Sequence, residues 1–190
     1  LVADILSHQA GLVPWIPYHH LTLEPLDSSK ELVSRNWSHQ YPLKIGPSEY
    51  ANRNVKYTDS TYEHSYSPDY PIQVADHLYL RAGFRDTIYR HIYDSGLLEP
   101  EYRYSDLGYY MLQQVIEQGT DTMLYPYVWY NFFAPMGAEN LCFLPLNRFP
   151  RERIVPTEND IFFRRQLLQG HVHDIGAAML GGIAGHAGLF

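Results

Sequence analysis

The spacing of apolar residues predicts several short helices separated by turns. Helical spacing recurs over residues 1–10, 86–96, 107–119 and 124–133, and the first three runs stop at glycines. Asp86 has the position of an N-cap for the second run, and Asp174 for a further helix through Leu180. Apolar positions in 29–39 fall at the same spacing, so we predict another helix there.

Extended structure is predicted in two stretches, both of which follow an unusual segment of the chain. Residues 74–80 alternate between apolar and polar positions, and residues 140–146 have strand character. Residues 39–71 hold six tyrosines and four prolines with few aliphatic side chains, which is typical of a long irregular loop. We therefore predict a single partial domain over 1–190 with a Tyr-rich loop insertion at 39–71, and we expect no internal repeat.

Composition disfavours or excludes several classes of partner and site. The 190 residues fit one domain, and the net charge of −7 disfavours a nucleic-acid partner. The one cysteine, Cys142, excludes internal disulfides and cysteine-based zinc clusters, and its apolar neighbours indicate a buried small side chain. No apolar run is long enough for a membrane span. Because the chain begins and ends inside apolar patterns, we expect a fragment of a longer protein.

Histidines gather near the end of the chain and raise the question of a metal. His171, His173 and His186 lie close to Asp174, and His-x-His is a common ligand pair. The spacing does not match the H-x-H-x-D-H pattern of metallo-β-lactamases. We therefore predict no metal and no cofactor, and we keep a His-based metal hydrolase as the second alternative.

The Tyr104-Ser105-Asp106 segment precedes the helical run that starts at 107. Serine or aspartate at this place is an ordinary N-cap. A tyrosine at a helix N-terminus near a lysine can also have a lowered pKa and accept a proton. Residues 1–190 contain neither G-x-S-x-G nor Ser-x-x-Lys, so no serine-nucleophile motif is present.

Six segments, in the right order, resemble one enzyme family. Ile5–Leu12 is similar to L-L-T-H-x-S-G-L, Tyr102–Tyr109 to Y-S-N-x-G-Y, Phe133–Gly137 to F-x-P-L-G-M, and Gly181–Phe190 to G-G-x-A-G-x-A-G-L-F, while Pro156–Glu158 and Gly170–Asp174 also fit. Together they resemble the class C-like serine β-lactamases and their esterase and penicillin-binding relatives, in particular a branch often fused to family 3 glycosidases.

The resemblance implies an α+β fold of the serine β-lactamase/penicillin-binding (transpeptidase-like) type, of which this chain is a mostly helical piece with few strands. It also implies an acyl-enzyme mechanism on an ester or amide, such as a cell-wall peptide, a β-lactam or an ester. Tyr104 and Asp106 match the catalytic Y-x-N positions, and Ser105 is the middle residue. We expect Ser105, Tyr57 and Tyr62 to bind substrate. The Ser-x-x-Lys nucleophile would lie outside this chain, which we expect to be inactive alone.

The resemblance further implies a small-molecule or peptidoglycan-like substrate, a fused glycosidase domain in the parent protein, and export to the periplasm or cell envelope. Aspartate at the usual asparagine position favours an ester or a different cell-wall amide, because an ionised carboxylate only accepts hydrogen bonds. The first alternative is a non-catalytic Tyr-rich module that binds carbohydrate or peptide, with its function in residues 41–70.

Overall fold

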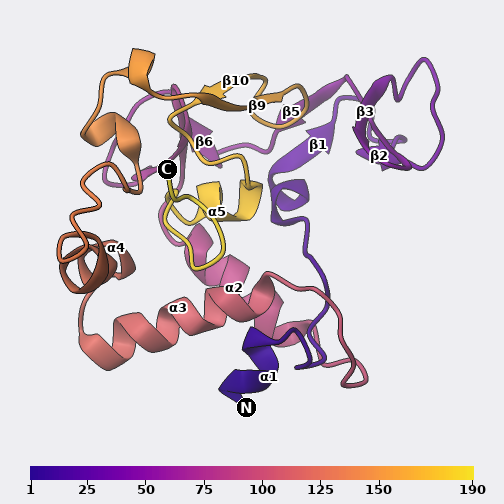
Figure 1. Ribbon diagram of the computed structural model, residues 1–190. Coiled ribbons are helices and arrows are strands. Elements are labelled where there is room, and N and C mark those ends of the chain that lie inside the picture. The colour runs from indigo at the N-terminus through magenta and orange to yellow at the C-terminus, as the bar shows by residue number, and fades with distance from the viewer.

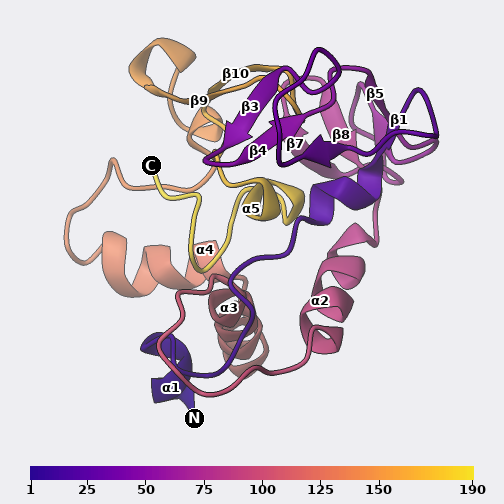
Figure 2. The same cartoon turned by 90° about the vertical axis from the view of Figure 1, so that its right-hand side faces the viewer.

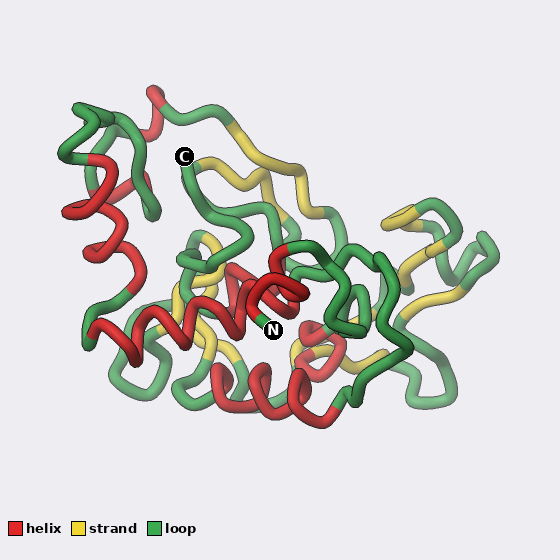
Figure 3. The backbone as a smooth tube through the Cα atoms, turned by 60° about the horizontal axis from the view of Figure 1, so that its bottom comes forward, coloured by secondary structure: helices red, strands yellow, loops and turns green.

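The computed structural model describes residues 1–190 and has a helical side and a side of small sheets (Figure 1). Helices α1, α2 and α3 lie together away from most strands, and α5 lies between the two sides. Loops and turns make up much of the backbone (Figure 3). The helices are α1 (Val2–Leu6), α2 (Phe84–Asp94), α3 (Leu107–Thr120), α4 (Leu124–Val128), which continues into a π-helical turn (Trp129–Phe133), and α5 (Ile175–Met179).

All strand pairs are antiparallel, and they form four separate sheets. The strands are β1 (Leu23–Pro25), β2 (Val33–Ser34), β3 (Leu43–Gly46), β4 (Glu49–Ala51), β5 (Val55–Tyr57), β6 (Tyr62–Glu63), β7 (Ile72–Ala75), β8 (Leu78–Leu80), β9 (Pro156–Asp160) and β10 (Gln166–Gln169). The sheet orders are β1-β5, β2-β4-β3, β6-β8-β7 and β9-β10. The architecture is mixed and compatible with α+β. The expectation of few strands is wrong, because strands of two to five residues are too short for alternation to reveal.

Two of these sheets are copies of one another, displaced by 29 residues along the chain. Each register pair of the first recurs in the second, so that Val33 opposite Ala51 becomes Tyr62 opposite Leu80. The irregularity in the β3–β4 pairing recurs at the same place in the β7–β8 pairing. Figure 2 shows β3, β4, β7 and β8 along one side of the molecule. We call residues 32–53 and 61–82 the first and second repeat.

The loops of the two repeats match as well. The Tyr41 N–H donates to Ser38 Oγ at 3.2 Å, and the Tyr70 N–H donates to Ser67 Oγ at 3.2 Å. The expectations of no internal repeat and of an irregular 39–71 segment are therefore wrong. Four of the 22 aligned positions are identical, too few for the repeat to stand out by eye: Ser38/Ser67, Tyr41/Tyr70, Pro42/Pro71 and Tyr50/Tyr79.

The helical predictions fare better than the others. Helices are confirmed in 1–10, 86–96, 107–119 and 124–133, and α5 follows its predicted cap, Asp174. Gly83, with φ of +78°, and not Asp86, is the N-cap of α2. The predicted helix over 29–39 is wrong, because that stretch contains β2 and turns. The predicted strand over 140–146 is also wrong, since no strand lies there.

One continuous apolar core joins the two sides of the molecule. It contains Ile88 of α2, Leu107 of α3, Leu80 of β8, Phe163 after β9 and Met179 of α5, all essentially inaccessible to solvent. Burial of such side chains contributes roughly 1.5–3 kcal/mol each, which makes this cluster the main source of stability. None of the helices combines the length and apolar character that crossing a bilayer requires.

Candidate functional site

The Tyr104-Ser105-Asp106 turn leads directly into α3, the longest helix. Asp106 is the N-cap residue, although its side chain makes no capping hydrogen bond. The Tyr104 hydroxyl instead donates a hydrogen bond to Asp106 Oδ1 at 2.9 Å. Because Tyr104 is 60% exposed, this phenol and carboxylate form a polar pair that a ligand can reach.

Ser105 fixes the turn from beneath. Its buried hydroxyl donates to the Val13 carbonyl at 2.7 Å and accepts from the Leu107 N–H at 3.2 Å. The Leu107 bond satisfies one of the N-terminal amides of α3, as a capping hydroxyl does. We therefore assign Ser105 to positioning its two neighbours; its contact with substrate stays a prediction.

His8 braces the turn from α1's side. Its Nδ1 accepts the backbone N–H of Ser105 at 3.2 Å, which leaves the ring proton of the neutral tautomer on Nε2. Its ring lies 4.6 Å from the Tyr104 ring, centroid to centroid. The contact joins the first predicted helix to the Tyr104 turn across nearly a hundred residues.

Asp174 and His186 form a second pair beside Asp106. Asp174 caps α5, and its Oδ1 accepts from the Ala177 N–H at 2.6 Å and pairs with His186 Nε2 at 3.0 Å. The His186 ring stacks on Tyr110 with centroids 4.5 Å apart. Its Nδ1 is buried without a hydrogen-bond partner. The stack and the carboxylate together hold the imidazole in one orientation.

The anionic groups of this site influence one another's ionisation. Burial opposes the charge of Asp174, but hydrogen bonds from His186 and the Ala177 N–H outweigh it and lower the pKa of Asp174. The hydrogen bond to Asp106 and the charge of that carboxylate raise the pKa of Tyr104. A lowered pKa of Tyr104 would require a lysine nearby, and the charged neighbours of this phenol within residues 1–190 are carboxylates.

Replacing Asp106 with asparagine is expected to lower the pKa of Tyr104 toward the ordinary tyrosine value of about 10. The substitution removes the adjacent negative charge and weakens the hydrogen bond that holds the phenol protonated. NMR titration with ring-labelled tyrosine measures the change. The exposed Asp86 on α2 supplies the control, since D86N should leave Tyr104 unaffected. An unchanged pKa of Tyr104 in D106N would show that Asp106 does not form the hydrogen bond with this phenol in solution.

Asp106, Asp174 and His186 together could hold a cation. One ligand atom from each lies within 4.8 Å of the others, and two carboxylates so close favour a positive charge between them. A metal ion or a side-chain ammonium would meet this need. The three histidines of the metal-hydrolase alternative do not converge, because His171 pairs with Asp76 at 3.0 Å while His186 pairs with Asp174.

Tyr57 and Tyr62 lie in a different aromatic cluster. The Tyr57 hydroxyl donates to the Phe163 carbonyl at 2.6 Å, and the Tyr62 hydroxyl to Thr22 Oγ1 at 3.1 Å. Their rings contact one another and Phe163. No ring contact or hydrogen bond connects them to Tyr104, so the structure does not bring the predicted substrate-binding residues together.

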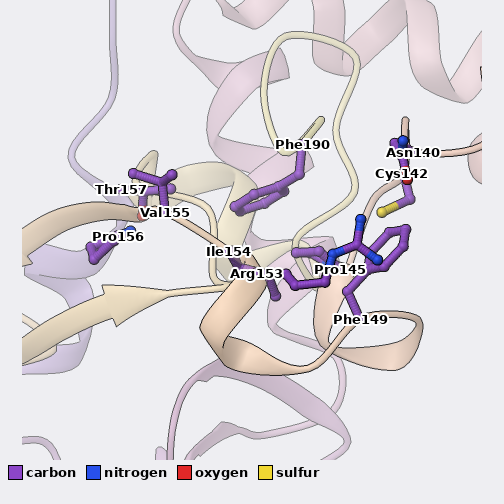
Figure 4. A pocket seen from close by; sticks show the side chains of 10 residues that line it. All are labelled: Asn140, Cys142, Pro145, Phe149, Arg153, Ile154, Val155, Pro156, Thr157 and Phe190. Carbon is purple, nitrogen blue, oxygen red and sulfur yellow. The ribbon is translucent and has the colours of Figure 1, made fainter.

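A cavity of about 450 Å³ near Phe190 is separate from this site (Figure 4). Phe149, Arg153 and Pro156 are among its lining residues, and none of the Tyr104 cluster is. Cys142 borders it but is fully buried, and burial raises the pKa of its thiol. The interpretation of Cys142 as a small buried side chain is confirmed.

Known proteins match only part of the chain. Over 99 residues it is 36% identical to a protein of Escherichia coli K12, and 37% identical to proteins of Salmonella paratyphi B and Salmonella newport. All three bear the name "Putative D-alanyl-D-alanine carboxypeptidase". The likeness is a distant homology. It covers 46% of this chain and 23% of each relative, so the chain spans about a quarter of the length of the curated relatives it matches.

No protein-family model matches the chain, and no solved structure matches it. The homology is consistent with a penicillin-binding/β-lactamase-like family and supports a peptidase-like or hydrolase-like role. The sequence did not reveal that His8 and the Asp174–His186 pair support Tyr104 and Asp106. The signal that could have found them is their place in three segments of the resemblance, Ile5–Leu12, Gly170–Asp174 and Gly181–Phe190.

Proposed function

We propose that this chain forms one face of the active site of a serine hydrolase of the β-lactamase/penicillin-binding type. The observation that carries the proposal is the exposed Tyr104 hydroxyl, held by Asp106 at the start of α3 and bordered by the Asp174–His186 pair. The serine and lysine of a Ser-x-x-Lys motif are proposed to come from outside residues 1–190. The chain alone is then inactive.

The negative charge of the site supports the proposal that a lysine comes from outside residues 1–190. Asp106 raises the pKa of Tyr104, so the phenol keeps its own proton at neutral pH and cannot accept a second one. A lysine ammonium between the carboxylates of Asp106 and Asp174 would offset their charge and make the phenolate accessible. Tyr104 would then take the proton of the serine hydroxyl as it attacks the carbonyl, and return it to the leaving group.

The names of the relatives support a proposal for the substrate class. We propose a peptide ending in D-alanyl-D-alanine, or a similar peptidoglycan-like amide or ester, with the protein acting in the cell envelope. A glycosidase domain fused to the parent protein belongs to the same proposal. In the proposed hydrolase site, Tyr104 and Asp106 are the catalytic residues, and Ser105 and His8 position them.

Replacing Tyr104 with phenylalanine is expected to lower kcat/KM by roughly 10²–10⁴-fold, the usual contribution of a general acid–base group. The measurement is release of D-alanine from a D-alanyl-D-alanine peptide by the full-length protein that contains these residues. The pH–rate profile should also lose the limb that reports the phenol. KM should change little, because the ring remains.

The matched control is Y102F, since Tyr102 is an exposed neighbour in the same turn without the Asp106 hydrogen bond. That variant should keep wild-type turnover. Full activity in Y104F, or hydrolysis by residues 1–190 alone that is lost in Y104F, would each contradict the proposed arrangement.

A further inference from the structure

The second repeat carries a pocket that the proposed hydrolase site does not use. It has a volume of about 360 Å³, the size of small-ligand sites, and lies between β7, β8 and the loops around residues 144–147 and 170–171. Tyr66, Tyr79, Gln73, Asn147 and His171 are its aromatic and polar lining residues. None of them belongs to the Tyr104 cluster.

One aromatic side chain of this pocket, Tyr66, is largely exposed to solvent. Tyr66 is 66% exposed, and its one aromatic neighbour is Tyr79, edge to face with ring centroids 6.5 Å apart. An exposed aromatic ring at the mouth of a cavity offers a flat apolar face to a ligand. Pyranose rings present a matching flat face of C–H groups.

The corresponding position of the first repeat shows the same feature. Trp37 lies 29 residues before Tyr66, and it is 57% exposed with the His39 ring as its neighbour. Only four positions are identical between the repeats, yet both copies place a large exposed ring here. Packing does not account for it, because neither ring is buried.

The polar groups of the pocket are those that bind neutral hydroxyls. The side-chain amides of Gln73 and Asn147 are exposed at the pocket, and each can both donate and accept. His171 Nε2 pairs with Asp76, whose pKa is lowered by hydrogen bonds from Arg151 and His171 despite the opposing effect of burial. Because Nε2 faces Asp76, Nδ1 is the ring nitrogen left for a ligand.

The charge of the lining selects against ionic ligands. No lysine, arginine, aspartate or glutamate lines the pocket. The nearby Asp76 is paired with Arg151 at 2.8 Å, so the two charges offset one another. A phosphate, a carboxylate or an amine would find no counter-charge there.

We propose that this pocket binds a neutral sugar ring of a glycan chain, with the pyranose stacked on Tyr66 and its hydroxyl or amide groups bonded to Gln73, Asn147 and His171 Nδ1. The site makes the protein a glycan binder independently of hydrolysis. It also places the first alternative, a Tyr-rich binding module with its function in residues 41–70, at Tyr66.

The test uses three neutral oligosaccharides as probes: tetra-N-acetylchitotetraose, cellotetraose and maltotetraose. Binding to residues 1–190 is followed by chemical-shift changes and titration calorimetry. At least one probe should bind. Y66A should weaken it roughly tenfold, and Q73A or N147A by roughly two- to tenfold. Y66F should keep the affinity, because the ring face is retained.

Y130A is the matched control, since Tyr130 is a 74% exposed tyrosine outside both repeats, and it should bind as wild type does. Unchanged melting temperatures in all variants separate lost binding from lost folding. The proposal is overturned if none of the three probes binds or if Y66A binds as tightly as wild type. Because no hydrolysis is measured, either result leaves the Tyr104 proposal to its own test.

Discussion

Replacing Arg164 with leucine is expected to lower the free energy of unfolding by about 3–5 kcal/mol. The Arg164 side chain is 0% exposed, and its Nε bonds to Asp160 Oδ2 at 2.8 Å. Its other nitrogens donate to the carbonyls of Val172 at 2.7 Å and His173 at 2.6 Å. Leucine would leave a buried carboxylate without its counter-charge and two carbonyls without donors.

The same arginine connects the core to the candidate site. The His173 carbonyl that it binds immediately precedes Asp174, which caps α5 and holds His186. Burial opposes the charge of Asp160, but the hydrogen bond and charge of Arg164, together with backbone hydrogen bonds, outweigh it and lower the pKa of that carboxylate. R164L should therefore displace Asp174 as well as destabilise the fold.

Denaturant unfolding measures the effect at neutral pH. R35L is the control, because Arg35 is exposed and has no ion-pair partner, and its stability should stay within about 0.5 kcal/mol of wild type. Adding D160L to R164L should recover part of the loss, since the unpaired charge disappears. A loss below about 1 kcal/mol in R164L would contradict a buried ion pair at this position.

The contribution of His19 to stability is expected to fall by about 1.4 kcal/mol for each pH unit of acidification below about 6.5. Burial and the neighbouring His20 lower the pKa of His19 to about 3, despite the opposing charge of Asp160. In the unfolded chain the His19 imidazole is protonated near pH 6.5, whereas in the folded chain it is protonated only near pH 3. The contribution of His19 to the free energy of unfolding is therefore complete above pH 6.5 and decreases as the pH falls, by about 3 kcal/mol at pH 4.5.

The slope of unfolding free energy against pH identifies the residue. Between pH 7.5 and 4.5, H19Q should lose most of this slope, whatever its stability at neutral pH, because glutamine does not titrate. H91Q changes an exposed histidine of α2 and should keep the wild-type slope. Equal slopes in H19Q and wild type would show that His19 is protonated in the folded chain.

Local patterns predicted most of the helices and the extended stretch 74–80, which β7 and β8 confirm, but they missed the other strands because those strands are short. The 14 residues of α3 form about four turns, which is long enough for the apolar spacing to predict a helix. Asp174 predicts the start of α5, because an N-cap bonds to an amide only three residues away. Strands such as β2 and β6 have two residues each, and only pairing with β4 and β8 makes them strands. The same limit hid the 29-residue repeat, which is a property of backbone register more than of residue identity.

Tertiary contacts also decide which predicted site residues act together. Tyr104 and Asp106 are two positions apart and could be paired from the sequence alone. Asp174 and His186 join them only because α5 packs next to the start of α3, and Tyr57 and Tyr62 are withdrawn into contacts with Phe163.

The sequence by itself determined the helices, the buried cysteine and the Tyr104-Ser105-Asp106 turn, because these depend on neighbours within about one helical turn. Only the tertiary structure decided the repeat, the raised pKa of Tyr104 and the open ring of Tyr66. Register, burial and the proximity of like charges arise from residues far apart in the chain, and no local pattern encodes them.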